Sequence, residues 1–188
     1  MRLRSAAAPL AAAMLLLSAC SAESSLEDFE ALRSELAGAE SVHITARVVT
    51  APATPREYVL TFDGGEDGCT VAVSEPEALA GISARITDGG TEIEYGSMVL
   101  AAGDMNGAGL SAVTALPRLA EAIGGAHASL SWTEGDESVV SLVPSDSESV
   151  ELRLGADGMP LSAEFTGSGG EVLIMCEIRE FSLTATED

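Results

Sequence analysis

Three cysteines and two histidines are the residues in this chain of 188 residues whose side chains could most readily do chemistry. Cys20 ends a leader-like segment, in which Arg2 and Arg4 precede an apolar run over residues 6–17. That run has the length of a secretory signal and is too short to span a bilayer. Cys20 therefore closes a segment that has the features of a secretory signal.

The segment Leu17-Ser-Ala-Cys20 resembles the lipobox of bacterial lipoproteins. The resemblance implies cleavage before Cys20 and a diacylglyceryl group on its sulfur. An ordinary secretory signal with a chance cysteine is the alternative. The small residues at 18 and 19 suit either cleavage, whereas Leu17 and Cys20 together favour the lipoprotein. We therefore expect a signal peptide over residues 1–19, a lipidated cysteine with a short tether over 20–24, and a membrane-anchored location outside the cytoplasm.

Cys69 and Cys176 each lie in a strand-like run with alternating apolar residues. Outside the cytoplasm such a pair can form a disulfide. Two buried free thiols are the other interpretation, and the sequence leaves both open.

The remaining polar residues predict no catalytic site, metal site or cofactor. His43 and His127 lack partners at metal-ligand spacing. No Gly-x-Ser-x-Gly elbow is present to start a hydrolase triad. The acidic runs 134–137 and 145–151 lack the spacing of a calcium loop. We therefore expect a protein that is not an enzyme.

The charge balance excludes one class of partner. The chain has 30 acidic residues against 9 basic ones, all of them arginines, and a net charge of −21. Nucleic-acid binding requires clustered cations, which this chain lacks. The same negative charge opposes peripheral binding of the protein to anionic lipid headgroups.

The spacing of apolar residues changes from helical to alternating early in the chain. Leu26, Phe29, Leu32 and Leu36 recur at helical spacing and predict a helix over residues 25–37. Residues 111–123 predict one or two short helices with Pro117 in the first turn. Alternation between tight turns predicts strands over 42–50, 57–62, 69–74, 82–87, 91–95, 98–101, 128–132, 137–143, 149–154, 161–166 and 171–183. The fold class is therefore α+β and mainly β, an antiparallel meander with helices covering one face.

Two hairpins and the leading helix resemble the LolA/LolB-type lipoprotein carrier fold. The first hairpin is Ile86-Thr-Asp-Gly-Gly-Thr-Glu-Ile-Glu-Tyr95, and the second, within residues 151–164, contains Asp157-Gly-Met-Pro160. The resemblance covers residues 25–185, which we take as one domain. It implies an open, strongly curved half-barrel with helices covering the concave face. The lipid-anchored, acidic character is closest to GerS-like lipoproteins of Gram-positive spore-formers.

The resemblance implies a cavity for a lipid or other apolar ligand. Small and aliphatic residues predominate over aromatics, so the concave face could hold a cavity instead of a filled core. The best candidates for its lid are Phe29, Leu32, Leu36, Leu116, Leu119 and Ile123. The alternative is that these side chains simply fill the core.

A second functional hypothesis also follows from the resemblance to GerS. In it, the protein binds a cell-envelope protein partner and holds or controls an envelope enzyme near the membrane.

Overall fold

The computed structural model describes residues 24–50, 54–103 and 109–185. A helix over residues 24–37 comes first. The elements that follow are β1 (Ala39–Thr50), β2 (Arg56–Gly65), β3 (Gly68–Glu75), the 3-10 turn η1 (Glu77–Leu79), β4 (Ile82–Thr87), β5 (Gly90–Tyr95), β6 (Met98–Gly103), α2 (Ala112–Gly125), β7 (His127–Glu134), β8 (Glu137–Ser145), β9 (Glu148–Leu154), β10 (Pro160–Gly167) and β11 (Val172–Ala185).

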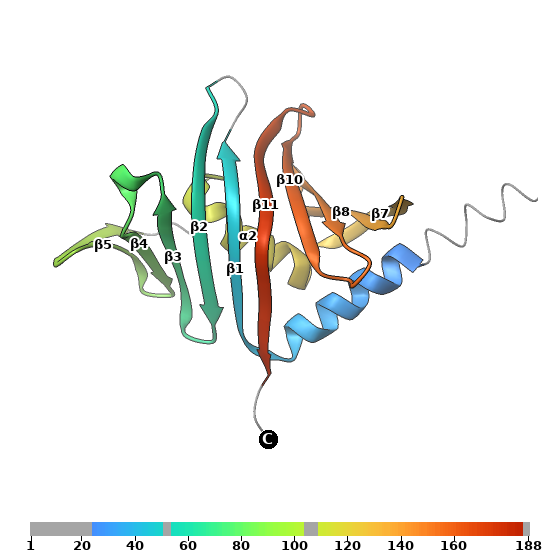
Figure 1. Cartoon of the computed structure of the whole chain (residues 1–188), viewed down its shortest axis with the longest axis horizontal. Helices are drawn as coiled ribbons and strands as arrows, with labels where there is room; N and C mark the ends of the chain where they lie inside the picture. Colours follow the sequence, from blue (N-terminus) through green and yellow to red (C-terminus); the bar gives the residue numbers. More distant parts are fainter. Residues whose placement is uncertain (1–23, 51–53, 104–108, 186–188) are drawn as a thin grey trace, which may run out of the picture.

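All eleven predicted strands are present and form one sheet. Its order is β6-β5-β4-β3-β2-β1-β11-β10-β9-β8-β7, and the pairings are antiparallel. The first and last strands pair at its centre, with Val42 opposite Leu183 and Val48 opposite Cys176 (Figure 1). The sheet is curved and does not close, so β6 and β7 remain edges. This architecture confirms the predicted mainly-β, open half-barrel.

The alternation in β1 explains how the sheet acquires its apolar face. Val42, Ile44, Ala46 and Val48 are buried, while the residues between them are partly exposed on the other face. Successive side chains of a strand point to opposite faces, so one face takes all four. This is the concave face, which α2 covers.

Helix α2 connects the two edges of the sheet across its concave face. Ser111 caps it: the Ser111 side chain accepts from the Thr114 amide, and the Thr114 hydroxyl accepts from the Ser111 amide at 2.8 Å. The expectation of Pro117 in the first turn was wrong, because the helix begins at Ala112 and runs unbroken to Gly125 with Pro117 inside it. The apolar spacing over this stretch outweighs the single missing amide donor of the proline.

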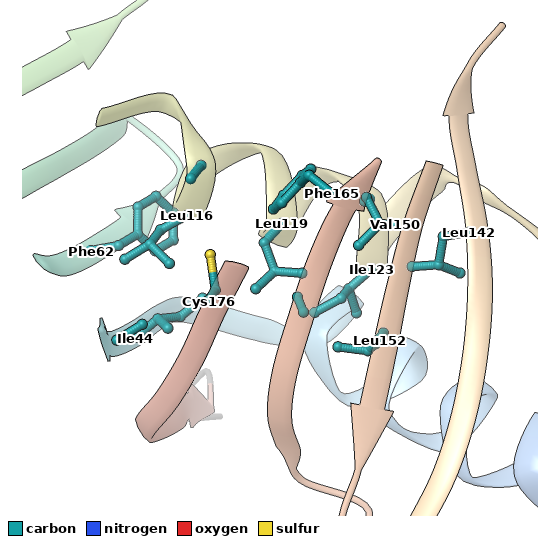
Figure 2. Packing of buried hydrophobic residues seen from close by; sticks show 14 of the residues in the cluster. Ile44, Phe62, Leu116, Leu119, Ile123, Leu142, Val150, Leu152, Phe165 and Cys176 are labelled. Carbon is teal, nitrogen blue, oxygen red and sulfur yellow. The ribbon is translucent and has the colours of Figure 1, made fainter. Parts of the chain in front are cut away.

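The main core lies between α2 and the sheet. Leu116, Leu119 and Ile123 of α2 are fully buried. Figure 2 shows Leu119 and Ile123 among the side chains of Val150, Leu152, Phe165 and others on the sheet. Neither helix described in the structure is long and apolar enough to cross a membrane.

The helix over residues 24–37 packs against the half of the sheet that contains β7–β11 (Figure 1). Phe29 and Leu32 are its buried residues on the apolar face. Ser138 of β8 donates a 2.6 Å hydrogen bond from Oγ to Oδ2 of Asp28, and Ser25 Oγ lies 2.9 Å from Thr133 Oγ1 of β7. These polar contacts fix the first turns of the helix to the sheet.

The opposite half of the sheet is covered far less. Every residue of β6 is exposed, and Met98, Val99 and Leu100 are each more than 60% exposed. The described core cluster therefore ends at β3 on this side, and the β5–β6 hairpin projects beyond it as an apolar wing (Figure 1).

Candidate functional site

An open hollow of about 1050 Å³ lies on the concave face beside α2. Four parts of the chain surround it: the end of helix 24–37 with the start of β1, the turn between β2 and β3, the turn between β4 and β5, and one side of α2. Its lining is Leu36, Ala39, Glu40, Ser41, Val42, Phe62, Gly64, Gly65, Glu66, Asp67, Gly68, Cys69, Ile86, Thr87, Asp88, Gly89, Pro117, Ala120 and Glu121. This volume is at the upper end of the range typical of small-molecule pockets.

One cross-strand row forms the floor of the hollow. Val42 pairs with Gly64, Gly64 with Cys69, and Cys69 with Ile86, so these four residues lie side by side on four adjacent strands. Gly64 contributes no side chain to the row. A Cβ atom there would come within 2.7 Å of the far end of the Phe62 ring, so glycine leaves room for this ring on the floor.

The rim of the hollow is acidic. Glu40 and Glu121 stand on β1 and α2, while the turns contribute the other carboxylates, Glu66, Asp67 and Asp88. No arginine or histidine lines the hollow among the residues that the structure describes. The hollow therefore combines an apolar floor with a negatively charged entrance.

Cys69 lies at the floor as a partly buried free thiol. Burial raises the pKa of its thiol, and the negative charge of Glu121 raises it further. Because the thiolate is disfavoured, Cys69 is a weak nucleophile near neutral pH.

Cys176 is also a free thiol, buried on β11. Burial raises the pKa of its thiol to about 12. Figure 2 shows Cys176 among the buried side chains of the core. Three strand spacings separate β3 from β11 in the sheet order, about 14 Å before any offset along the strands. A disulfide spans a Cα separation of only about 6 Å, so the pair is unbridged in this fold.

The six lid candidates divide between core and hollow. Leu36 is partly buried and lines the hollow. The other five are at most 3% exposed and fill the core between the helices and the sheet: Phe29, Leu32, Leu116, Leu119 and Ile123. Helix α2 therefore has two different faces. One face packs into the core, and the other, with Pro117, Ala120 and Glu121, lines the hollow.

The other sequence-selected residues lie away from the hollow or outside the described part. His43 Nδ1 is 2.6 Å from Asp63 Oδ1, and its Nε2 is 3.9 Å from Glu180 Oε2, on the outer face of the sheet. His127 is exposed on β7. No group of three or more potential metal ligands occurs within the described ranges. Cys20 lies outside the described residues.

Sequence reasoning missed the acidic rim, although its residues were visible as turns. Asp63-Gly-Gly-Glu-Asp-Gly68 and Asp88-Gly-Gly90 each predict a chain reversal, and neither segment by itself predicts that the two turns meet. In a meander, turns at the same end of neighbouring hairpins meet at one edge. That rule could have placed the β2–β3 and β4–β5 turns together.

Comparisons with known proteins give a fold. No protein-family model matches the sequence, and no curated protein matches it. Among solved structures, an uncharacterized conserved protein from Thermus thermophilus matches with a TM-score of 0.51 at 15% identity, covering 87% of this chain and 90% of that one. A LolA superfamily protein from Nitrosomonas europaea matches with a TM-score of 0.48 at 15% identity, covering 89% and 96%.

A candidate outer membrane lipoprotein-sorting protein domain from Vibrio parahaemolyticus gives a TM-score of 0.47 at 11% identity, covering 87% of this chain and 95% of that one. At 15% identity, the match to the Thermus thermophilus protein shows a shared fold and nothing further. A closer relation to GerS stays a prediction.

Proposed function

We propose that this protein is a membrane-anchored, extracytoplasmic and non-catalytic lipoprotein that binds a lipid or another apolar ligand in the hollow of its half-barrel. The observation that carries the proposal is the hollow of about 1050 Å³ with a floor of Val42, Phe62 and Ile86. An acyl or alkyl chain is costly to keep in water, and laying it on this floor would bury the chain's own apolar surface.

The anchor part of the proposal depends on Cys20. The described helix begins at residue 24, so the connecting segment reaches at most about 14 Å when extended. A lipid on Cys20 would hold the half-barrel close to the membrane surface. A ligand could then pass between the bilayer and the hollow over a short distance.

Ligand binding can be tested with a neutral apolar dye, N-phenyl-1-naphthylamine, whose fluorescence rises in an apolar site. The protein would begin at Ser21, which retains every described contact and carries no acyl group that could compete for the hollow. We expect saturable binding of about one dye molecule per chain, because the hollow has the size of a single small-molecule site. Absence of saturable binding would contradict the proposed function.

A substitution that fills the hollow locates the dye. Ala120 lies on the side of α2 that lines the hollow, so Ala120→Phe should fill part of it and weaken binding. Ala31 is exposed on helix 24–37 and does not line the hollow, so Ala31→Phe is the matched control and should bind as the original chain does. Equal binding by both variants would place the dye elsewhere.

The anchor has its own test. Cells expressing the full chain should incorporate labelled palmitate into this protein, and Cys20→Ser should abolish the label. Label retained on the Cys20→Ser chain would remove the lipid anchor from the proposal without affecting the hollow.

A second candidate function is favoured by the wing at β6. Its edge is unpaired and carries exposed Met98, Val99 and Leu100, which is the kind of surface a protein partner can cover. In this alternative the lipoprotein holds or controls a cell-envelope enzyme. A photocrosslinking amino acid at Val99 should then give one dominant adduct in intact cells, and the same group at exposed Glu171 should give none. No adduct at Val99 would exclude this function for the wing.

A further inference from the structure

The rim of the hollow has carboxylates without cationic partners. None of Glu40, Glu66, Asp67, Asp88 and Glu121 forms an ion pair with any basic side chain in the part of the chain that the structure describes. The carboxylates therefore remain available to a charge supplied by a ligand.

None of the described arginines lines the hollow. Arg85 of β4 is exposed on the opposite face of the sheet, where it borders a separate depression with Asp67. Arg33 donates to the carbonyl oxygens of Ile123 and Ala126, at 2.8 and 2.6 Å, at the C-terminal end of α2. Arg118 of α2 pairs with Glu148 at 3.0 Å, toward β9. Neither of these two guanidinium groups lines the hollow.

The negative field of the rim reaches the floor. Glu121 contributes to the raised pKa of the Cys69 thiol, after burial, which is the larger cause. A negative group on the floor is thus disfavoured on two grounds. A positive group at the rim avoids the second of these penalties, because exposed carboxylates stand on several sides of the apolar strip and attract it.

We propose, building on the ligand-binding function above, that the hollow selects amphiphiles that carry a positive charge: a single alkyl or acyl chain joined to an amine or quaternary ammonium group. The chain lies along the row formed by Val42, Cys69 and Ile86, and the cation lies at the rim near Glu40 and Glu121. An anionic amphiphile with the same chain is repelled by the same carboxylates.

Three probes with the same chain length separate charge from hydrophobicity. Dodecyltrimethylammonium, dodecanol and dodecyl sulfate, each used below its micelle concentration or solubility limit, would compete with N-phenyl-1-naphthylamine for the protein beginning at Ser21. We expect the cation to compete about tenfold more strongly than the anion at low salt, with dodecanol between them. Raising the salt concentration should narrow this difference, because ions screen exposed charges.

Two double variants, each lacking two carboxylates, test whether the preference for the cation comes from the rim. Glu40→Gln with Glu121→Gln should move the affinity for the cation toward that for dodecanol. Glu27 on helix 24–37 and Asp136 in the β7–β8 turn are exposed and do not line the hollow. Glu27→Gln with Asp136→Asn removes two charges from the net balance and should leave the preference unchanged.

The outcomes distinguish the inference from the function on which it depends. Equal competition by all three probes would overturn the charge selection and leave apolar-ligand binding standing. An equal loss of preference in both double variants would assign the effect to net charge and also overturn the inference. Failure of the dye itself to bind would instead remove the proposed function. Slower alkylation of Cys69 with dodecyltrimethylammonium bound would place the probe on the floor, and unchanged alkylation would place it elsewhere.

Discussion

Arg33 of helix 24–37 donates a 2.8 Å hydrogen bond from Nε to the carbonyl oxygen of Ile123 in the last turn of α2. One of its terminal nitrogens also donates to Ala126 at 2.6 Å, and its guanidinium lies 4.5 Å from the centre of the Phe29 ring. Backbone carbonyls at a helix C-terminus lack partners within the helix and carry partial negative charge. Arg33 satisfies two of them and so joins the two helices that flank the hollow.

Arg33→Met should lower the free energy of unfolding by about 2 kcal/mol, because it removes charge-assisted hydrogen bonds and leaves half-buried carbonyls without their donor. Urea denaturation followed by circular dichroism measures the change. Arg179→Met, at an exposed position on β11, should change stability by less than about 0.5 kcal/mol. A loss no larger than that of the control would show that Arg33 does not hold the helices together.

Leu119 and Leu100 provide a contrast between core and wing. Leu119 is fully buried against the sheet, whereas Leu100 is 67% exposed on β6. Leu119→Ala should destabilise the fold by about 2–5 kcal/mol through lost burial and the cavity left behind. Leu100→Ala should cost less than about 0.5 kcal/mol by the same denaturation measurement. Comparable losses would mean that the wing is covered in solution.

The two thiols of the described domain should react at different rates. Cys69 is partly exposed in the hollow, and Cys176 is about 1% exposed in the core. Iodoacetamide without reductant, at pH 8 under native conditions, should label Cys69 slowly and leave Cys176 unlabelled. Urea should make both thiols reactive, as peptide mass spectrometry would report. Recovery of a Cys69–Cys176 disulfide from the native protein would contradict the observed strand order.

Cys176 also makes stability depend on pH in the alkaline range. Its folded-state pKa is raised to about 12, above the unfolded value of about 8.5. Below the unfolded pKa the thiol is protonated in both states, so its neutral burial is fully favourable. Between about pH 9 and 12 the unfolded chain loses the proton and the folded chain keeps it, so stability falls as pH rises.

Removal of this thiol should therefore flatten the alkaline loss of stability. Free energies of unfolding at pH 8, 9 and 10 should fall more steeply for the original chain than for Cys176→Ala, by up to about 1.4 kcal/mol per pH unit. Cys69 is present in both proteins and cancels in the comparison. Parallel pH profiles would mean that Cys176 opens to solvent before it titrates.

Much of the fold was predictable because single segments encode their own periodicity. The alternation from Val42 to Val48 indicates which residues of β1 face the core, and this can be predicted without knowing the partner strands. The position of Pro117 was not predictable in the same way, because the helix start depends on the mutual capping of Ser111 and Thr114. Thr114 stands where a capping box usually has Glu or Gln.

The hollow was not predictable, because it is formed by residues of several strands and no single segment shows how the strands pair. Val42, Gly64, Cys69 and Ile86 become neighbours only through the register of three strand pairs. A shift of one residue in any pair would turn a side chain to the other face. For the same reason the sequence grouped Leu36 with Phe29 and Leu32 as one stripe, although the sheet covers only the latter two fully.

The pairing of β1 with β11 has a consequence for how the chain folds. On either side of this seam the strands follow one another in sequence, β1 to β6 and β7 to β11, so each half can form through contacts between near neighbours. Among the strand pairs of the sheet, this seam is the one that joins residues more than a hundred positions apart, as with Val42 and Leu183. Closing so long a loop carries the largest entropic cost in the molecule, so the joining of two preformed half-sheets is the step that should limit the folding rate.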